Sequence, residues 1–116
     1  MSDLRFSSLA EVRSVIDALD RELLNLLSQR AACVAAAGEF KASEGEVRAQ
    51  DRLERMIRER REWAEAEGLD PSFVEALFRS ITSYFISREL EQFWEQSAER
   101  SDPRTHRDPE ANEPLV

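Results

Sequence analysis

A continuous amphipathic stretch near the N-terminus limits the possible folds of this chain more than any other feature. Ser7 or Ser8 is a suitable N-cap, Glu11 completes a capping-box pattern with Ser8, and no proline occurs before Gly45. The pattern predicts one helix of about 30 residues, which would be about 45 Å long. Its apolar side chains recur at intervals of three and four residues, with one interruption: Leu9, Val12, Ile16, Leu19, Leu23, Leu26, Cys33, Ala37 and Phe40.

A helix of this length extends beyond any core that the rest of the chain can build. The chain has 116 residues, enough for one domain, and a domain of about 100 residues has a radius of gyration of about 13 Å. Something must therefore cover the apolar stripe along the excess. A second copy of the chain is the simplest partner, because two-fold dimers are the commonest soluble oligomers. We therefore expect a homodimer.

Two further helices complete an all-α fold with three helices per chain. The second is predicted from about Ala49 to Ala66 and is ended by Gly68. The third begins with Asp70 as N-cap and Pro71 at the first helical position. We expect the phenylalanines and tryptophans at helical spacing to belong to the core. No strand-like alternation is present.

The composition changes after Gln96. Residues 97–116 contain three prolines, five acidic residues and three arginines among few apolar side chains. We therefore expect a helical domain over residues 1–96 and a disordered acidic tail over 97–116.

Composition excludes several classes of function. With 24 acidic against 16 basic residues the net charge is −8, which disfavours nucleic acid as a partner, and no apolar run is long enough to span a membrane. Cys33 cannot form an internal disulfide, and Met1–Ser8 lacks the pattern of a signal peptide, so we expect a cytoplasmic protein. No glycine-rich phosphate loop or metal-ligand cluster is present, so we expect neither cofactor nor metal.

Two cations interrupt the first apolar stripe. Arg30 stands where an apolar residue is due, and Lys41 follows eleven residues later on the same face, about 16 Å away. Such a pair indicates a bound anion. The alternative is that the stem of Arg30 packs while its guanidinium reaches a carboxylate or solvent, and that the pairing with Lys41 is accidental.

Arg13 and Arg52 are further candidates. Arg13 lies seventeen residues before Arg30, about 25 Å along the helix, so it can share a small ligand only with Arg30 of the other chain in an antiparallel dimer. Arg52 opens the second helix. For both, the alternative is a solvated surface charge.

Glu89 is the third anomaly. It follows Phe85 by four residues and Phe78 by eleven, which places a carboxylate on a largely apolar helical face. A buried carboxylate must be paired or protonated. The alternatives are an internal salt bridge to an arginine, or a surface glutamate at the edge of the stripe. Its neighbours Arg88 and Glu91 should face solvent.

Several short segments together carry a resemblance. They are Phe40-Lys41-Ala42-Ser43-Glu44, Trp63-Ala64-Glu65, Gly68-Leu69-Asp70-Pro71, Phe73-Val74-Glu75 and Leu77-Phe78. From about Leu9 to Phe93 the chain resembles the all-helical chorismate mutase family, and within it the isochorismate pyruvate lyase branch. The resemblance implies an intertwined homodimer. It also implies that Arg13 from the partner subunit, with Arg30, Lys41 and Arg52, holds the two carboxylates and the ether oxygen of a small dianionic substrate.

Three positions bear on the substrate. Typical mutases carry acidic residues at the positions of Ala49 and Leu53, where they help to hold the 4-hydroxyl of chorismate, whereas the lyase branch has small or apolar residues there. This favours isochorismate. Many family members have glutamine at the position of Glu89, and a carboxyl group can donate to the ether oxygen only when protonated, so the resemblance predicts an acid-shifted pH profile. It also places Thr82, Phe85 and Ile86 in the substrate site.

The resemblance implies an isochorismate pyruvate lyase that forms salicylate and pyruvate by a pericyclic elimination, with weak chorismate mutase activity. One alternative is a chorismate mutase with an acid-shifted pH optimum, or a mutase for amino-substituted chorismate. The others are a homologue without activity that binds a shikimate-derived anion or a partner enzyme as a regulator, and a simple helical dimerisation module.

Overall fold

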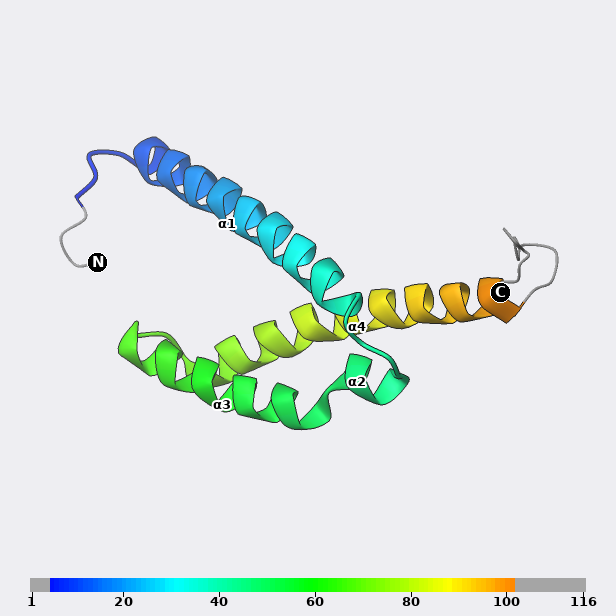
Figure 1. Cartoon of the computed structure of the whole chain (residues 1–116). Helices are drawn as coiled ribbons and strands as arrows, with labels where there is room; N and C mark the ends of the chain where they lie inside the picture. Colours follow the sequence, from blue (N-terminus) through cyan, green and yellow to red (C-terminus); the bar gives the residue numbers. More distant parts are fainter. Residues whose placement is uncertain (1–4, 102–116) are drawn as a thin grey trace. The chain divides into compact units, whose positions relative to one another are not determined.

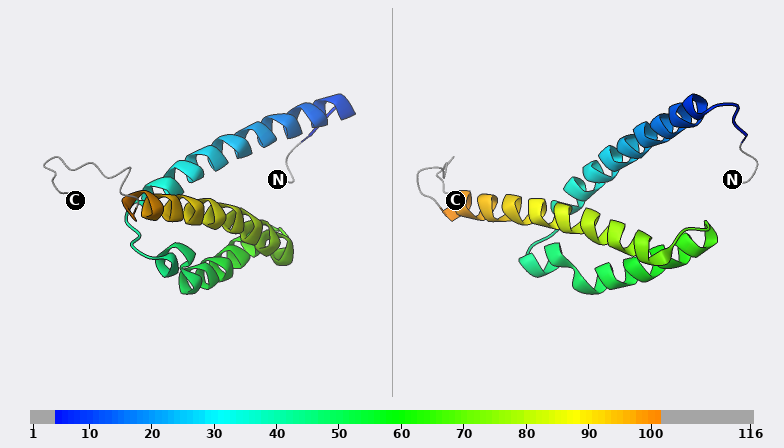
Figure 2. Two further views of the ribbon diagram at one scale, coloured as in Figure 1. Left: turned by 90° about the vertical axis from the view of Figure 1, so that its right-hand side faces the viewer. Right: turned by 180° about the vertical axis from the view of Figure 1, so that it is seen from behind.

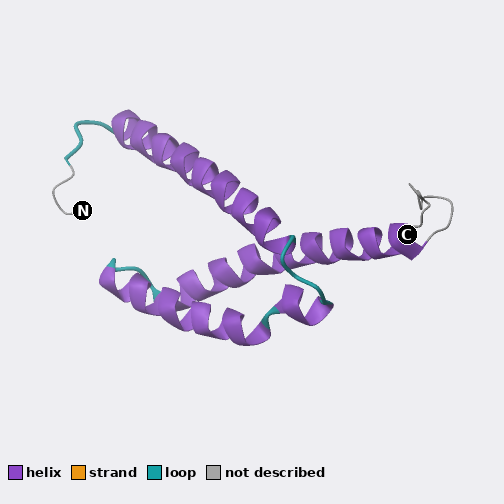
Figure 3. Ribbon diagram, in the orientation of Figure 1, coloured by secondary structure: helices purple, strands orange, loops and turns teal. Residues whose placement is uncertain are grey.

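The described part of the chain is entirely helical. The computed structural model describes residues 5–101, and no strand occurs among them (Figure 3). Its helices are α1 (Leu9–Gly38), α2 (Glu44–Arg48), α3 (Gln50–Ala66) and α4 (Pro71–Ser101) (Figure 1). Residues fall into two compact units that divide between Ala37 and Gly38. The predicted all-α class and its three long helices are confirmed, and α2 is an addition. None of the helices in the described range is apolar enough over sufficient length to span a membrane.

Helix α1 begins with the predicted capping box. The backbone N–H of Glu11 donates to Ser8 Oγ at 3.1 Å, and the backbone N–H of Ser7 donates to Glu11 Oε1 at 2.7 Å. The hydrogen bonds from the Ser7 backbone and hydroxyl hold the pKa of the Glu11 carboxyl below its usual value.

The apolar stripe of α1 remains open to solvent in the single chain. The helix has 30 residues and none of them is buried. Its large side chains are about half or more exposed, at Leu9, Ile16, Leu19, Leu23, Leu24 and Leu26. Helical propensity alone does not hold so long an amphipathic helix in water, because most of its stability comes from packing of the apolar face. The helix therefore requires a covering surface.

Helix α2 is a single short turn that the apolar periodicity did not predict. Ser43 is its N-cap, and Ser43 Oγ accepts from the Glu46 N–H at 3.2 Å. Glu46 reaches back, and its Oε1 accepts from the Ala42 N–H at 2.5 Å. The signal was therefore present, as a serine followed three residues later by a glutamate. Ala49 ends α2 in a left-handed conformation, with φ 42° and ψ 56°, and the chain then continues directly into α3.

Helices α3 and α4 form an antiparallel pair. They lie side by side in both views of Figure 2, and α2 also packs on α4. Gly68 adopts φ 76° in the connection, a conformation that glycine accepts without steric cost. Asp70 Oδ1 then accepts from the Ser72 N–H at 2.9 Å, and Pro71 is the first helical residue. The predicted stop and start are both confirmed.

The core of the second unit is a narrow seam between these helices. Six apolar side chains are 6% exposed or less: Val47, Met56, Ile57, Ala64, Val74 and Leu90. Burying an isoleucine or methionine in this way stabilises the fold by about 1.5–3 kcal/mol.

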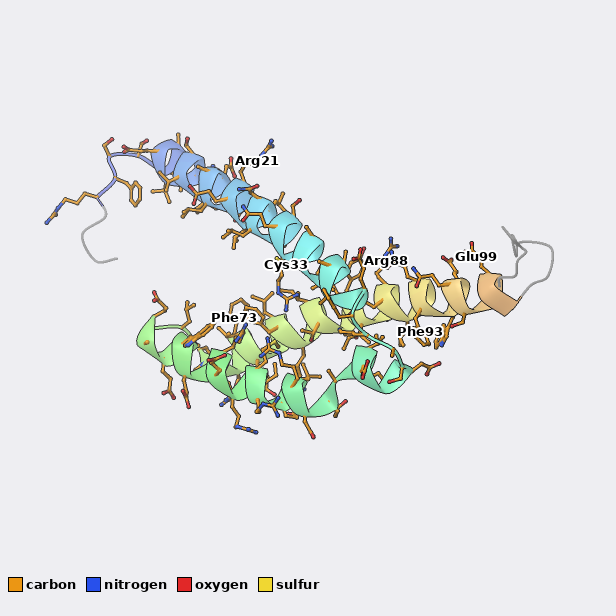
Figure 4. All side chains as sticks on the ribbon, viewed as in Figure 1. Arg21, Cys33, Phe73, Arg88, Phe93 and Glu99 are labelled. Carbon is orange, nitrogen blue, oxygen red and sulfur yellow. The ribbon has the colours of Figure 1, made fainter. Side chains whose placement is uncertain are left out.

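The expectation that all tryptophans and phenylalanines belong to the core is wrong for this chain. Phe73 is 59% exposed, Trp63 is 52% exposed and Trp94 is 47% exposed (Phe73 is labelled in Figure 4). The reason is geometric: a helix that packs against one neighbour buries one side only, so aromatic residues beside the seam stay in water.

Helix α4 also continues further than the composition suggested. Residues 97–101 are its last residues, although the change in composition after Gln96 predicted that the tail begins there. The remaining predicted tail, residues 102–116, lies outside the described residues.

Candidate functional site

A partly buried ion pair forms the centre of the candidate site. Lys41 Nζ donates to Glu89 Oε2 at 3.1 Å, and the two residues are 48 positions apart in the sequence. The side chain of Glu89 is 9% exposed and that of Lys41 is 24% exposed. Burial of Glu89 required a partner or a proton, and the structure provides a partner, which is a lysine rather than an arginine. Glu89 here accepts a hydrogen bond, and its action as a protonated donor stays a prediction.

The position of Lys41 follows from the loop that carries it. Its backbone N–H donates to the carbonyl of Gly38 at 3.2 Å, which closes a turn at the end of α1. Two residues further on, Ser43 caps α2. The indole N–H of Trp94 on α4 donates to the carboxylate of Glu44. The loop and the start of α2 are thus attached to α4, the loop through the Lys41 ammonium and α2 through the Glu44 carboxylate.

Glu89 points inward while its charged neighbours do not. Leu90 beside it is buried, and Arg88 and Glu91 are exposed, as predicted. Arg88 and Phe93 point to opposite sides of α4 in Figure 4, which illustrates how sharply the helix separates its charged from its half-buried side.

The remaining predicted residues of the second unit lie at the start of α3 and along α4. Ala49 precedes α3, and Leu53 in its first turns is half-buried. Arg52, one residue earlier, is exposed. Thr82, Phe85 and Ile86 are half-buried in α4. The hydroxyl of Thr82 donates to the carbonyl of Phe78 at 2.8 Å, so its own helix already uses the Thr82 proton.

Arg13 and Arg30 belong to the first unit, on α1. Their seventeen-residue separation corresponds to about 25 Å along the helix axis. Arg13 is exposed. One chain therefore cannot bring both guanidinium groups to the same small anion, and a shared site requires Arg13 of another chain.

A second charged cluster joins α3 to α4 and was not predicted. Arg79 donates to Glu54 at 3.1 and 3.4 Å and to Glu75 at 2.8 Å, and Arg61 donates to the other oxygen of Glu75 at 2.7 Å. Hydrogen bonds from Arg79 hold the pKa of both carboxyls below the usual value for glutamate, and Arg61 adds to the effect at Glu75. These carboxylates in turn raise the pKa of Arg79. Only the spacing of Glu75 and Arg79, one helical turn apart, signalled this cluster in advance.

The Lys41 ammonium keeps donor capacity beyond its bond to Glu89. A lysine ammonium carries three N–H donors and no acceptor, so Lys41 can donate to Glu89 and still offer two N–H groups to a ligand. A partly buried ammonium also acts through a lower dielectric than a surface one, which strengthens its attraction to negative charge.

The described part of the chain is an all-helical domain in which a lysine that follows α1 pairs with a carboxylate late in α4. The chain belongs to the chorismate mutase type II family, whose sequence profile matches residues 12–90. It is 40% identical over 91 residues to an isochorismate pyruvate lyase of Pseudomonas aeruginosa, and these aligned residues cover 78% of this chain and 89% of that protein. It is also 36% identical over 76 residues to the T-protein of Enterobacter agglomerans, which covers 65% of this chain but only 20% of that longer protein.

Proposed function

We propose that this chain is an isochorismate pyruvate lyase, which converts isochorismate to salicylate and pyruvate without a cofactor. The similarity to a lyase over most of both chains is the observation that carries the proposal. Ala49 and Leu53 support it, because neither side chain can offer the acidic group that typical mutases carry at these positions.

The reaction needs positioning and charge rather than a nucleophile. The ether C–O bond of the enolpyruvyl group breaks while a hydrogen moves from the ring to the methylene carbon, so pyruvate leaves and the ring becomes aromatic. Arg30 and Arg13 of a partner subunit would bind the carboxylates and fold the side chain over the ring, and Arg52 would complete the cationic set. Thr82, Phe85 and Ile86 would shape the wall of the site.

Lys41 would act on the ether oxygen. Negative charge builds on that oxygen as the C–O bond breaks, and a fixed ammonium stabilises it most when it is already in place. The ion pair with Glu89 holds the ammonium in one position before substrate arrives.

The proposed enzyme is a homodimer. The support is α1, whose apolar residues are exposed in the single chain and whose Arg13 and Arg30 are too far apart to share one ligand. A second copy would cover the stripe and bring Arg13 to the site of its partner.

The decisive experiment supplies purified protein separately with isochorismate and with chorismate, at about pH 5 and about pH 7.5. Salicylate fluorescence and prephenate formation are the readouts. Salicylate from isochorismate is the expected result. Prephenate alone would instead establish a chorismate mutase, which the family assignment makes the second candidate. If the protein forms neither salicylate nor prephenate, the result would favour a regulatory binding homologue.

A matched pair of variants tests the site. Lys41→Met should lower kcat by about 100-fold or more, because an interaction aimed at the developing oxyanion is lost. Arg88→Met removes a cation that is exposed on α4, one residue from Glu89, and should leave kcat unchanged. Circular dichroism should show equal helix content in both. Equal turnover of the two variants would contradict the role of Lys41.

A further inference from the structure

The backbone conformation at Gly38 does not require glycine. It is the last residue of α1, and it does not adopt the positive φ that Gly68 adopts. Alanine is a better helix former than glycine in a helix interior. Neither the local turn nor helix propensity therefore accounts for glycine at this position.

The space beside Gly38 does account for it. A Cβ atom at Gly38 would lie 3.3 Å from Glu89 Oε2, which is tighter than nine in ten real contacts of Cβ atoms. The other two glycines differ, because the nearest atom to a Cβ at Gly45 is 3.8 Å away and none lies within 4 Å at Gly68. Gly38 thus marks the one glycine where a side chain would press on the buried carboxylate.

The oxygen concerned is the one that holds Lys41. Glu89 Oε2 accepts from Lys41 Nζ at 3.1 Å, and Gly38 is also bonded through its carbonyl to the Lys41 backbone N–H. The three residues therefore form one contact set within the second unit. A methyl group at position 38 would move the carboxylate by a few tenths of an ångström and with it the direction in which the ammonium points.

We propose that Gly38 is a positioning residue for the reaction, because its missing side chain lets the Glu89 carboxylate lie against the end of α1 and aim Lys41. This inference rests on the proposed function for its kinetic consequence. A displacement of about 1 Å in a reacting group can cost about 100-fold in rate. The smaller displacement of the Glu89 carboxylate should lower kcat by about tenfold.

The first test compares Gly38→Ala with Gly45→Ala, a matched control in which the new methyl group meets only an ordinary contact. Gly38→Ala should lower kcat about tenfold with little change in KM, because the arginines that bind the carboxylates are untouched. Gly45→Ala should leave both constants unchanged. Unaltered kcat in Gly38→Ala would overturn the proposal.

A double-mutant cycle separates this contact from a general structural effect. In a Glu89→Ala background, Gly38→Ala should raise the urea midpoint of unfolding, since alanine favours the helix and meets no carboxylate. In the native background the rise should be smaller or absent. Glu89→Asp, whose carboxylate is one methylene shorter, is the second background if Glu89→Ala folds poorly.

The two proposals fail in different ways. Equal midpoint changes in both backgrounds would overturn the Gly38 contact, whatever the activity. Failure of the parent protein to convert isochorismate or chorismate would overturn the proposed function and the kinetic part of this inference, while the midpoints would still report whether Gly38 and Glu89 are coupled.

Discussion

Arg79 on α4 donates through Nη1 and Nη2 to both carboxylate oxygens of Glu54 on α3, at 3.4 and 3.1 Å. Its Nε donates at the same time to Glu75, one turn earlier on its own helix. One guanidinium thus joins the two helices of the hairpin. This fork geometry suits arginine and not lysine, because several fixed donors are used together.

The Arg79 cluster should make stability depend on acidity. The pKa of Glu54 and of Glu75 is lower in the folded chain than in the unfolded one, because Arg79 donates to each. The bridges therefore stabilise the fold at pH values above about 4.3, the pKa of glutamate in the unfolded chain. This contribution disappears as the pH falls through the lower pKa values of the two carboxyls in the folded chain. Arg79→Gln should lower the urea midpoint at about pH 7 and change it less at about pH 3.

A control fixes the interpretation of that result. Arg58→Gln removes an exposed arginine from the same hairpin, on α3, and should shift both midpoints only slightly. If Arg79→Gln and Arg58→Gln behaved alike at both pH values, the bridges would contribute nothing measurable.

Glu89→Gln should lower kcat, because a neutral amide cannot hold the Lys41 ammonium through the ion pair that the carboxylate makes. Glu91→Gln on the exposed side of α4 is the control and should keep the parent kcat. Steady-state kinetics of the two variants are the measurement, and an equal kcat in both would contradict a role for Glu89 in positioning Lys41.

Complementation between inactive variants tests the shared site. Arg13→Ala and Arg30→Ala should each be inactive alone, because each removes one cation from both sites of a homodimer. Mixing equal amounts after unfolding and refolding should restore about a quarter of the parent activity, since half the dimers are mixed and each has one intact site. No recovery, with dimers present by light scattering, would contradict a site that combines two chains.

Ala49 should be a point of stored strain. Its φ of 42° lies in the left-handed region, which costs a residue other than glycine about 1–2 kcal/mol. Ala49→Gly should therefore raise the free energy of unfolding by about 1 kcal/mol. Ala76→Gly, at an exposed position inside α4, should lower it by about 1 kcal/mol. A loss of stability in both variants would show that the left-handed conformation costs little here.

Local signals predicted the helices well. Ser8 with Glu11, Gly68, and Asp70 with Pro71 mark helix ends through bonds made within a few residues, so the sequence pattern specifies them. Contacts between residues far apart in the sequence were harder to predict. Periodicity placed Glu89 on an inward face. It also placed Lys41 on the first helix, which is wrong, because α1 ends at Gly38 and Lys41 lies in the loop that follows. The meeting of the two residues depends on how α2 and α4 pack.

The aromatic residues show a limit of predicting burial from periodicity. Periodicity identifies an apolar face but does not state how wide a face the neighbouring helix covers. Trp63 and Phe73 therefore looked like core residues, although the seam between α3 and α4 buries only smaller or aliphatic side chains such as Ile57 and Val74. Gly38 was missed for a related reason, because its significance lies in the Glu89 oxygen beside it.

The bare apolar stripe of α1 has a consequence for dosage. None of the residues of α1 is buried in the single chain. Under our proposal a working site therefore exists only in a dimer. At concentrations below the dissociation constant of the pair, the number of sites would rise with the square of the chain concentration. Halving expression would then remove about three quarters of the output, and specific activity would fall on dilution of the purified protein.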